Sequence, residues 1–275
     1  SSICWTSGDR LQMSDLGKQI SALMRRVRDH GQLPGSEQIV AETFELLGYV
    51  PGTLAPDEVL SGFDELLRHV WQETLHVLER HEERSYAEGI PRELIRAYPD
   101  SVAEAREISE AEGFVAGVQR LLSLWYPQLR RCFLSVSQSR KTRGGKDFEL
   151  QLERLLTLAE VPHESQERQN RTDLVLPSVA VFERNRNEAM VVSVKRTLRE
   201  RWREVAEELF NLRAPNVYLL TADEKATIGQ VKGICGRYNI YLVVWDHVKR
   251  DRFASEPLVL GYTEWATDRV AQMRG

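Results

Sequence analysis

The sequence predicts a mixed α+β or α/β protein, with an all-α N-terminal part followed by a mixed central sheet flanked by helices. Two observations carry this prediction. Apolar residues in the first half recur at the spacing of amphipathic helices, and the second half alternates short apolar runs with amphipathic stretches. A chain of 275 residues can form two modest domains. We therefore expect a helical domain at 1–128 and a second domain at 129–275.

Helices are expected along the whole first half. The first is indicated by apolar residues at helical spacing, namely Leu16, Ile20, Leu23, Met24 and Val27. Further helices are expected at 37–47, 57–83 and 102–125. The last should stop before Pro127, because a residue that precedes proline is disfavoured in the helical conformation. The basic segment 137–146 contains two adjacent glycines and is expected to form a loop between the domains.

The second half changes its hydrophobic period. A helix is expected at 147–159, where apolar residues again follow helical spacing. The remaining elements are expected as strands at 161–166, 173–176 and 190–194, a helix at 199–212, a strand at 216–220, a helix at 225–238 and a strand at 240–245. This order predicts a mixed sheet with helices on its faces.

The composition is that of a globular protein without a membrane span. Hydrophobic residues make up 42% and charged residues 28% of the chain. No apolar run approaches the ~20 residues that cross a bilayer, and the N-terminus lacks a signal-peptide pattern. The cysteines Cys4, Cys132 and Cys235 are far apart, which argues against a disulfide framework or a zinc site. We therefore expect a cytoplasmic protein.

The net charge of −4 is unevenly distributed. Residues 1–138 carry 14 basic and 21 acidic side chains, a balance of −7, whereas residues 139–275 carry 23 and 20, a balance of +3. The potential that attracts phosphates is local rather than global. Any nucleic-acid surface is therefore expected mainly in the second half.

Asp173 and Lys195 are the first candidates for catalysis. Asp173 begins one expected strand and Lys195 ends another, so adjacent strands would bring the two charges to one edge of the sheet. Carboxylates and water are the ligands that Mg²⁺ prefers. The metal lowers the pKa of its bound water and neutralises charge on a phosphate, and a lysine can stabilise the transition state. The pattern favours metal-dependent phosphodiester cleavage.

A second acid is less obvious. Many nucleases of this chemistry place it two residues before the lysine, but that position holds Ser193, whose hydroxyl is a poor substitute for a carboxylate. Two helices nearby in the sequence offer acids. The residues alone leave open which of them serves, and the candidates are Glu204, Glu207 and Glu208 downstream and Glu149 and Glu153 upstream.

Three segments resemble the type II restriction endonucleases with the PD-(D/E)XK fold: SRKTRGGKDFELQLERLL (139–156), RTDLVLPS (171–178) and VVSVKRTLRERWREVAEEL (191–209). The resemblance is greatest to the branch with the EcoRII catalytic domain, PspGI and NgoMIV. That branch carries its second acid on the following helix and leaves Ser-X-Lys on the strand. The resemblance implies that Asp173 and Glu208 bind the metal, that Lys195 is the catalytic lysine and that Glu149 is the upstream acid. Thr172 departs from the proline of the motif's name.

The same resemblance implies a set of DNA contacts. Arg199, Glu200 and Arg201 occupy the position of the branch's reader of CCGG, and arginine and carboxylate groups suit the edges of guanine and cytosine. Gln138 lies where the branch has a glutamine that faces the minor groove. Backbone phosphates, which position without specifying, are expected to contact the basic residues Lys141, Arg143 and Lys146.

The resemblance implies a Mg²⁺-dependent endonuclease that cuts double-stranded DNA at a palindrome with a CCGG core. It implies 5′-phosphate and 3′-hydroxyl ends and a 5′ overhang. A palindrome calls for a homodimer, with a tetramer or higher assembly on DNA as an alternative. Flanking A/T pairs, as read by BsaWI, are compatible. The other interpretations left open are a CCNGG or CCWGG enzyme, a repair-type nuclease and a non-catalytic DNA-binding protein of this fold.

Overall fold

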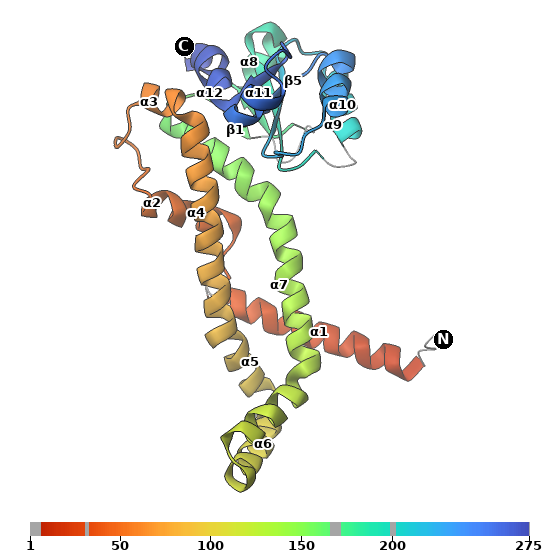
Figure 1. Ribbon diagram of the computed structural model, residues 1–275. Helices are drawn as coiled ribbons and strands as arrows, with labels where there is room; N and C mark the ends of the chain where they lie inside the picture. Colours follow the sequence, from red (N-terminus) through yellow and green to blue (C-terminus); the bar gives the residue numbers. More distant parts are fainter. Residues whose placement is uncertain (1–6, 31–32, 166–171, 199–201, 275) are drawn as a thin grey trace. The chain divides into compact units, whose positions relative to one another are not determined.

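The computed structural model describes residues 7–30, 33–165, 172–198 and 202–274, without the side chains of residues 7–15, 141 and 142. The chain forms two compact units (Figure 1). We call them the helical unit, which comprises Ser1–Gln38 and Leu75–Arg143, and the sheet unit, which comprises Ile39–Thr74 and Gly144–Gly275. Two long helices, α4 (Phe63–Arg84) and α7 (Phe114–Leu158), each contribute residues to both units.

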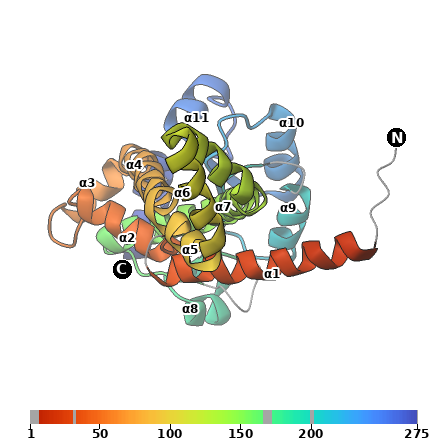
Figure 2. The same ribbon diagram turned by 90° about the horizontal axis from the view of Figure 1, so that it is seen from below.

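The helical unit is built around the apolar face of its first helix. Its elements are α1 (Ser7–Asp29), the start of α2 (Ser36–Leu46), the end of α4, η1 (Ser85–Gly89), α5 (Ile90–Ala97), α6 (Pro99–Glu112) and most of α7. Leu23 of α1, Leu94 of α5 and Cys132 of α7 belong to one buried cluster. Figures 1 and 2 show α1 running across α5 and α7. The apolar spacing that predicted the first helix therefore faces this core.

Helices α6 and α7 differ from the single helix predicted at 102–125. The break lies at Gly113, whose φ of 98° belongs to the region that favours glycine. The predicted stop before Pro127 is wrong, because α7 continues through this proline. Trp125 and Cys132, on either side of Pro127, are both buried in the core of the helical unit. Tertiary packing thus outweighs the local cost of proline in a helix.

The predicted loop at 137–146 is also wrong, because this segment is part of α7. One of its two glycines serves packing rather than a turn. A Cβ atom at Gly144 would overlap the guanidinium of Arg196, while Gly145 has open space around it. The absence of a side chain at Gly144 lets Arg196 approach the helix backbone, which is a recurrent reason for glycine inside regular structure.

The sheet unit contains six strands in the order β1-β2-β3-β4-β5-β6. Their bounds are β1 Glu164–Ser165, β2 Leu174–Leu176, β3 Met190–Lys195, β4 Val217–Thr221, β5 Tyr241–Val244 and β6 Val259–Gly261. The first three strands pair antiparallel, and the pairs from β3 to β6 are parallel. The predicted mixed sheet is confirmed, and β6 is an addition that the sequence reading missed.

Helices cover the sheet. They are the ends of α2, α4 and α7 that belong to this unit together with α3 (Pro56–Ser61), α8 (Val179–Arg184), η2 (Arg186–Glu188), α9 (Trp202–Asn211), α10 (Ile228–Val231), η3 (Lys232–Arg237), α11 (Asp246–Arg252), α12 (Tyr262–Trp265), η4 (Ala266–Val270) and η5 (Ala271–Arg274). Within the described residues, no helix is both long enough and apolar enough to pass through a bilayer.

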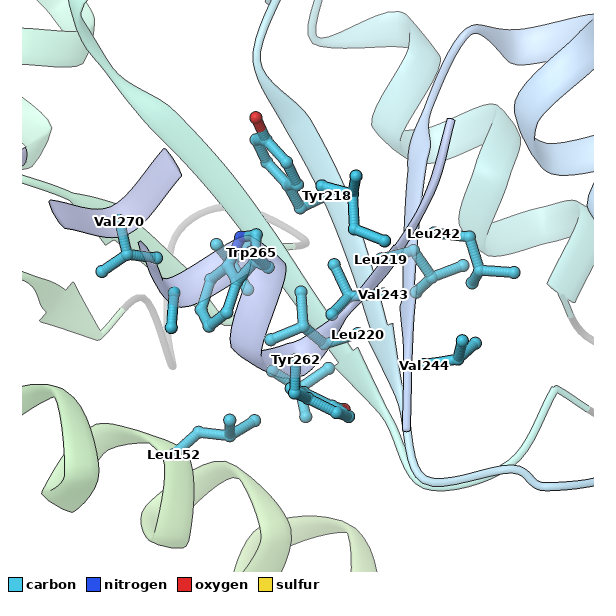
Figure 3. Packing of buried hydrophobic residues seen from close by; sticks show 14 of the residues in the cluster. Leu152, Tyr218, Leu219, Leu220, Leu242, Val243, Val244, Tyr262, Trp265 and Val270 are labelled. Atoms are coloured by element: carbon cyan, nitrogen blue, oxygen red, sulfur yellow. The ribbon is translucent and has the colours of Figure 1, made fainter. Parts of the chain in front are cut away.

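The core of the sheet unit joins side chains from β4, β5, α12 and the C-terminal part of α7 (Figure 3). Leu152, Leu219, Tyr262 and Trp265 are fully buried within it. Complete burial of one such aliphatic side chain stabilises a fold by about 1.5–3 kcal/mol. The same cluster includes Leu174 of β2 and Val192 of β3, the two strands whose ends carry the candidate catalytic residues Asp173 and Lys195.

The two units divide the chain differently from the predicted ranges 1–128 and 129–275. Phe44 and Phe63, expected in the helical domain, are buried in the core of the sheet unit. Asp64, also buried, accepts a hydrogen bond from the backbone amide of Asp246 at 2.8 Å. The predicted boundary falls inside α7. Apolar periodicity identifies a helix but does not say which core its apolar face joins.

Candidate active site

Asp173 is the centre of a small network at the edge of β2 and β3. One of its carboxylate oxygens, Oδ2, accepts three hydrogen bonds: from Ser193 Oγ at 3.0 Å, from the Val194 amide at 2.6 Å and from Lys195 Nζ at 3.0 Å. The antiparallel pairing of β2 with β3 brings these groups together. Adjacent strands thus bring Asp173 and Lys195 into an ion pair, as the sequence predicted.

The alternation of β3 explains which side chains reach this site. Ser193 and Lys195 are two residues apart, so they project from the same face of the strand. Ser193 is fully buried, while the Lys195 side chain is 36% exposed at the strand's end. Val192 and Val194 project from the opposite face and are buried in the core. The strand therefore places one hydroxyl and one ammonium beside Asp173.

Glu149 lies in the electrostatic field of this pair. Burial raises the pKa of its carboxyl, and the Asp173 carboxylate raises that pKa further, while Lys146 and Lys195 lower it. Lys146 Nζ lies 3.8 Å from Glu149 Oε2. Two acids in one partly buried region repel each other, which a bound cation would relieve. Glu149 thus interacts electrostatically with both members of the pair, and its role as the upstream acid stays a prediction.

The three acids downstream of the lysine all lie on α9, in different environments. Glu204 is exposed, whereas Glu208 is half-buried. Glu207 accepts a hydrogen bond from the Tyr238 hydroxyl at 2.9 Å, which gives it a structural partner. The structure thus carries Glu208 on the helix after β3, where the resemblance requires it. Its role as a metal ligand stays a prediction.

The expected DNA-contacting residues lie in different parts of the structure. Gln138 is exposed on the portion of α7 that belongs to the helical unit, and Arg143 ends that portion half-buried. Lys141 lies in α7, but its side chain is outside the described part. Lys146 is in the sheet unit beside Glu149. The triplet Arg199, Glu200 and Arg201 lies outside the described residues.

The donor set at this site suits a hard divalent cation. Within the ranges that the structure describes, no group of three or more His, Cys, Asp or Glu side chains is close enough together to form a metal site. Mg²⁺ does not require such a group, because it retains several waters and is often held by one or two carboxylates. Asp173 and Glu149 place two mutually repelling carboxylates in this partly buried region, and a divalent cation would offset their charge.

Two contacts of Asp173 were not foreseen from the sequence. The Ser193 hydroxyl is a poor replacement for a carboxylate as a metal ligand, but it donates a hydrogen bond to Asp173. Its position two residues before Lys195 was the available signal. The Val194 amide is the other contact, and a backbone donor cannot be recognised from the type of residue that carries it. Both donors help to fix the orientation of the Asp173 carboxylate.

The family model described as EcoRII C terminal matches residues 120–257 of this chain. The type II restriction enzyme SsoII from Shigella sonnei is 38% identical over 102 residues, an alignment that covers 33% of this chain and 33% of SsoII. The chain thus spans about a third of the length of this curated relative.

Two kinds of solved structure share the fold. A metal-depleted Ecl18kI in complex with uncleaved, modified DNA has a TM-score of 0.77 and 24% identity, covering 94% of this chain and 85% of that chain. A complex of the restriction endonuclease PspGI with substrate DNA has a TM-score of 0.58 and 18% identity, covering 88% and 93%. The predicted fold, a helix-flanked mixed sheet of the PD-(D/E)XK type, is thereby confirmed.

Proposed function

Since the chain belongs to the EcoRII C-terminal family of type II restriction endonucleases, we propose that it is a Mg²⁺-dependent enzyme that cleaves double-stranded DNA within a specific sequence. The observation that carries this proposal is the pairing of Asp173 with Lys195 beside Glu149. SsoII, the curated relative, is named a type II restriction enzyme, which supports the same activity for this chain.

The proposed metal ligands are Asp173 and Glu208. Glu149 lies close enough to Asp173 for the Asp173 carboxylate to raise the pKa of Glu149. When bound, Mg²⁺ would supply an activated water and neutralise charge on the phosphate. The β3 donors hold Asp173 in a fixed orientation, which reduces the entropy lost when it binds a ligand.

Lys195 and Glu149 supply the remaining chemistry of the proposed site. The Lys195 ammonium, held 3.0 Å from Asp173, is suited to stabilise negative charge that develops on a phosphate oxygen. The raised pKa of Glu149 suits a group that accepts a proton from the attacking water. We propose that water attacks the phosphorus and that the bond from phosphorus to the 3′-oxygen breaks, so that the cut leaves a 5′-phosphate and a 3′-hydroxyl.

Arg199, Glu200 and Arg201 are the proposed readers of a palindrome with a CCGG core. Two arginines and a carboxylate match the acceptors of guanine and the donor of cytosine in the major groove. Gln138 is proposed to contact the central pairs from the minor groove. The basic residues proposed to contact the backbone are Lys141, Arg143 and Lys146. A palindrome read symmetrically implies a homodimer with one active site for each strand.

One digestion tests this proposal. A sequenced genome is treated with the protein and Mg²⁺, and the ends of all fragments are sequenced. We expect one recurring palindrome with a CCGG core, a 5′ overhang and a 5′-phosphate, and no cutting when EDTA removes the metal. The variant Asp173→Ala should bind DNA without cutting it.

Other results of the digestion would point elsewhere. A recurring CCNGG or CCWGG would leave the enzyme class intact and replace the core sequence. Ends without a shared sequence would contradict site specificity and favour a repair-type nuclease. Uncut DNA across many sequences, with binding retained, would refute catalysis and favour a DNA-binding protein of this fold.

A further inference from the structure

The connection from β3 to α9 is fixed at Leu198, whose backbone forms hydrogen bonds with two side chains. Leu198 is buried, and both polar groups of its backbone are satisfied by side chains from another part of the chain. Its amide donates to Asp223 Oδ2 at 2.8 Å, and its carbonyl accepts from Gln230 Nε2. Leu198 directly precedes the triplet Arg199–Arg201. The backbone that leads into the proposed base reader is therefore fixed.

The side chain of Gln230 has only one way to face Leu198. Its Oε1 accepts a hydrogen bond from the Thr227 amide at 2.7 Å as part of the capping box of α10. The amide nitrogen Nε2 is thereby left to point at the Leu198 carbonyl. One glutamine thus caps its own helix and anchors the β3–α9 connection.

The two carboxylate oxygens of Asp223 likewise accept hydrogen bonds from two different parts of the chain. Its Oδ1 accepts from the Lys225 amide at 2.9 Å, and its Oδ2 accepts from the Leu198 amide. The Asp223 amide donates to Thr221 Oγ1 at 3.1 Å, directly after β4. The carboxylate therefore ties the turn after β4 to the connection after β3, and charge strengthens both hydrogen bonds.

The far side of the triplet is anchored to the same region. Trp202 begins α9, and its ring packs so close to Gly233 that a Cβ atom there would overlap it. Gly233 lies in η3, which directly follows α10. Leu198 and Trp202, the described residues on either side of the triplet, are thus held by one continuous helical segment through Gln230 and Gly233.

We propose that Asp223 and Gln230 are positioning residues that fix the backbone at Leu198, the last described residue before the base-reading triplet, and that this anchor determines how strongly the enzyme discriminates its site. This inference rests on the proposed function. Bidentate contacts between side chains and bases depend on placement within about 0.5 Å. The contacts of Leu198 and Trp202 fix the two described residues between which the triplet lies in the sequence.

Gln230→Glu is the sharpest test. Glutamate keeps the acceptor that caps α10, loses the donor to Leu198 and sets a carboxylate against the Leu198 carbonyl. Asp223→Asn breaks the other contact independently, so the test does not depend on one variant. The matched control is Glu224→Gln, an acid-to-amide change at the adjacent residue, whose side chain is 66% exposed.

The measurement is kcat/KM on the wild-type recognition sequence and on duplexes with one G·C pair replaced by A·T. Circular dichroism verifies that each variant folds. Loss of one good base contact corresponds to a roughly 5- to 150-fold change in discrimination. We expect Gln230→Glu and Asp223→Asn each to lower kcat/KM tenfold or more on the recognition sequence and less than about threefold on the substituted duplexes. Glu224→Gln should keep the wild-type ratio.

Two results would refute the proposed positioning role of Asp223 and Gln230. Equal losses on all duplexes would show a structural role without a role in reading, and an unchanged ratio in folded variants would show no role in either. A wild-type protein that cuts no recurring sequence would refute the proposed function itself, and with it the positioning role of Asp223 and Gln230. The wild-type digestion separates that outcome from the first two.

Discussion

Replacing Lys195 with methionine should separate catalysis from stability. Methionine keeps most of the apolar stem but removes the ammonium that lies 3.0 Å from Asp173 Oδ2. Because the lysine side chain is 36% exposed, water screens this pair, and its net contribution to folding is about 0–1 kcal/mol. The transition state is different, since loss of one group that stabilises developing charge costs about 10²- to 10³-fold in rate.

The assay is single-turnover cleavage of a short duplex at saturating Mg²⁺ and DNA, with thermal unfolding measured in parallel. For Lys195→Met we expect a rate at least 100-fold lower, corresponding to about 2.7 kcal/mol or more, and a melting temperature within about 4 °C of the wild type. A cleavage rate within tenfold of the wild type would refute the assignment of Lys195.

Lys146→Met is the matched control for this experiment. Its side chain is 30% exposed, similar to that of Lys195, and its ammonium lies 3.8 Å from Glu149. As a proposed phosphate contact, it should affect binding more than chemistry. We expect weaker DNA binding, a salt dependence reduced by about one charge, and a single-turnover rate within about threefold of the wild type.

Three further predictions address the site and its scaffold. Because burial and Asp173 raise the pKa of Glu149, its ionised form destabilises the fold, so Glu149→Gln without metal should raise the free energy of unfolding above neutral pH. Urea titrations should show that this gain disappears as the pH falls through the raised pKa of Glu149, where the wild-type carboxyl becomes protonated. Removing Mg²⁺ with EDTA should abolish cleavage and leave DNA retention in a gel-shift assay, and cleavage in EDTA would contradict the metal requirement. Asp64→Ala should lower the free energy of unfolding by about 1–3 kcal/mol, because the Asp246 amide loses its buried partner, and a loss no larger than that of the exposed Asp57→Ala would contradict this.

The central strands could be predicted because their local and tertiary preferences agree. Val191, Val192 and Val194 form an apolar run of the type that favours a buried strand, and β3 lies in the middle of the sheet. Asp173 and Lys195 stood at the ends of two such runs, so pairing of these strands was enough to bring them together. The antiparallel partner and the exact donors required the structure.

The course of α7 could not be predicted, because the contacts that stabilise this helix through Pro127 and Gly144 are tertiary rather than local. Pro127 and Gly144 both argue locally for an interruption. Pro127 is compensated by the burial of Trp125 and Cys132, and Gly144 is needed for the approach of Arg196. Each compensating residue lies elsewhere in the fold or becomes relevant only once the core has formed.

The hydrogen bonds that organise the site region were even less visible. The pattern Thr227-x-x-Gln230 is a capping-box signal, but nothing in it indicates the contact of Gln230 with Leu198. The Val194 amide that binds Asp173 has no sequence signal, because every non-proline residue offers one. Residue types therefore indicated which chemistry was present, and the structure showed how those groups are oriented.

The most direct test of the account compares Glu208→Gln with Glu204→Gln on the same helix. Glu208 on α9 is the proposed second metal-binding acid, since the position of that acid on β3 is occupied by Ser193. In single-turnover cleavage with Mg²⁺, we expect Glu208→Gln to lose at least about 100-fold in rate and Glu204→Gln, at an exposed position, to stay within about threefold. Equal rates for Glu208→Gln and the wild type would contradict the relocated acid and, with it, the proposed active site.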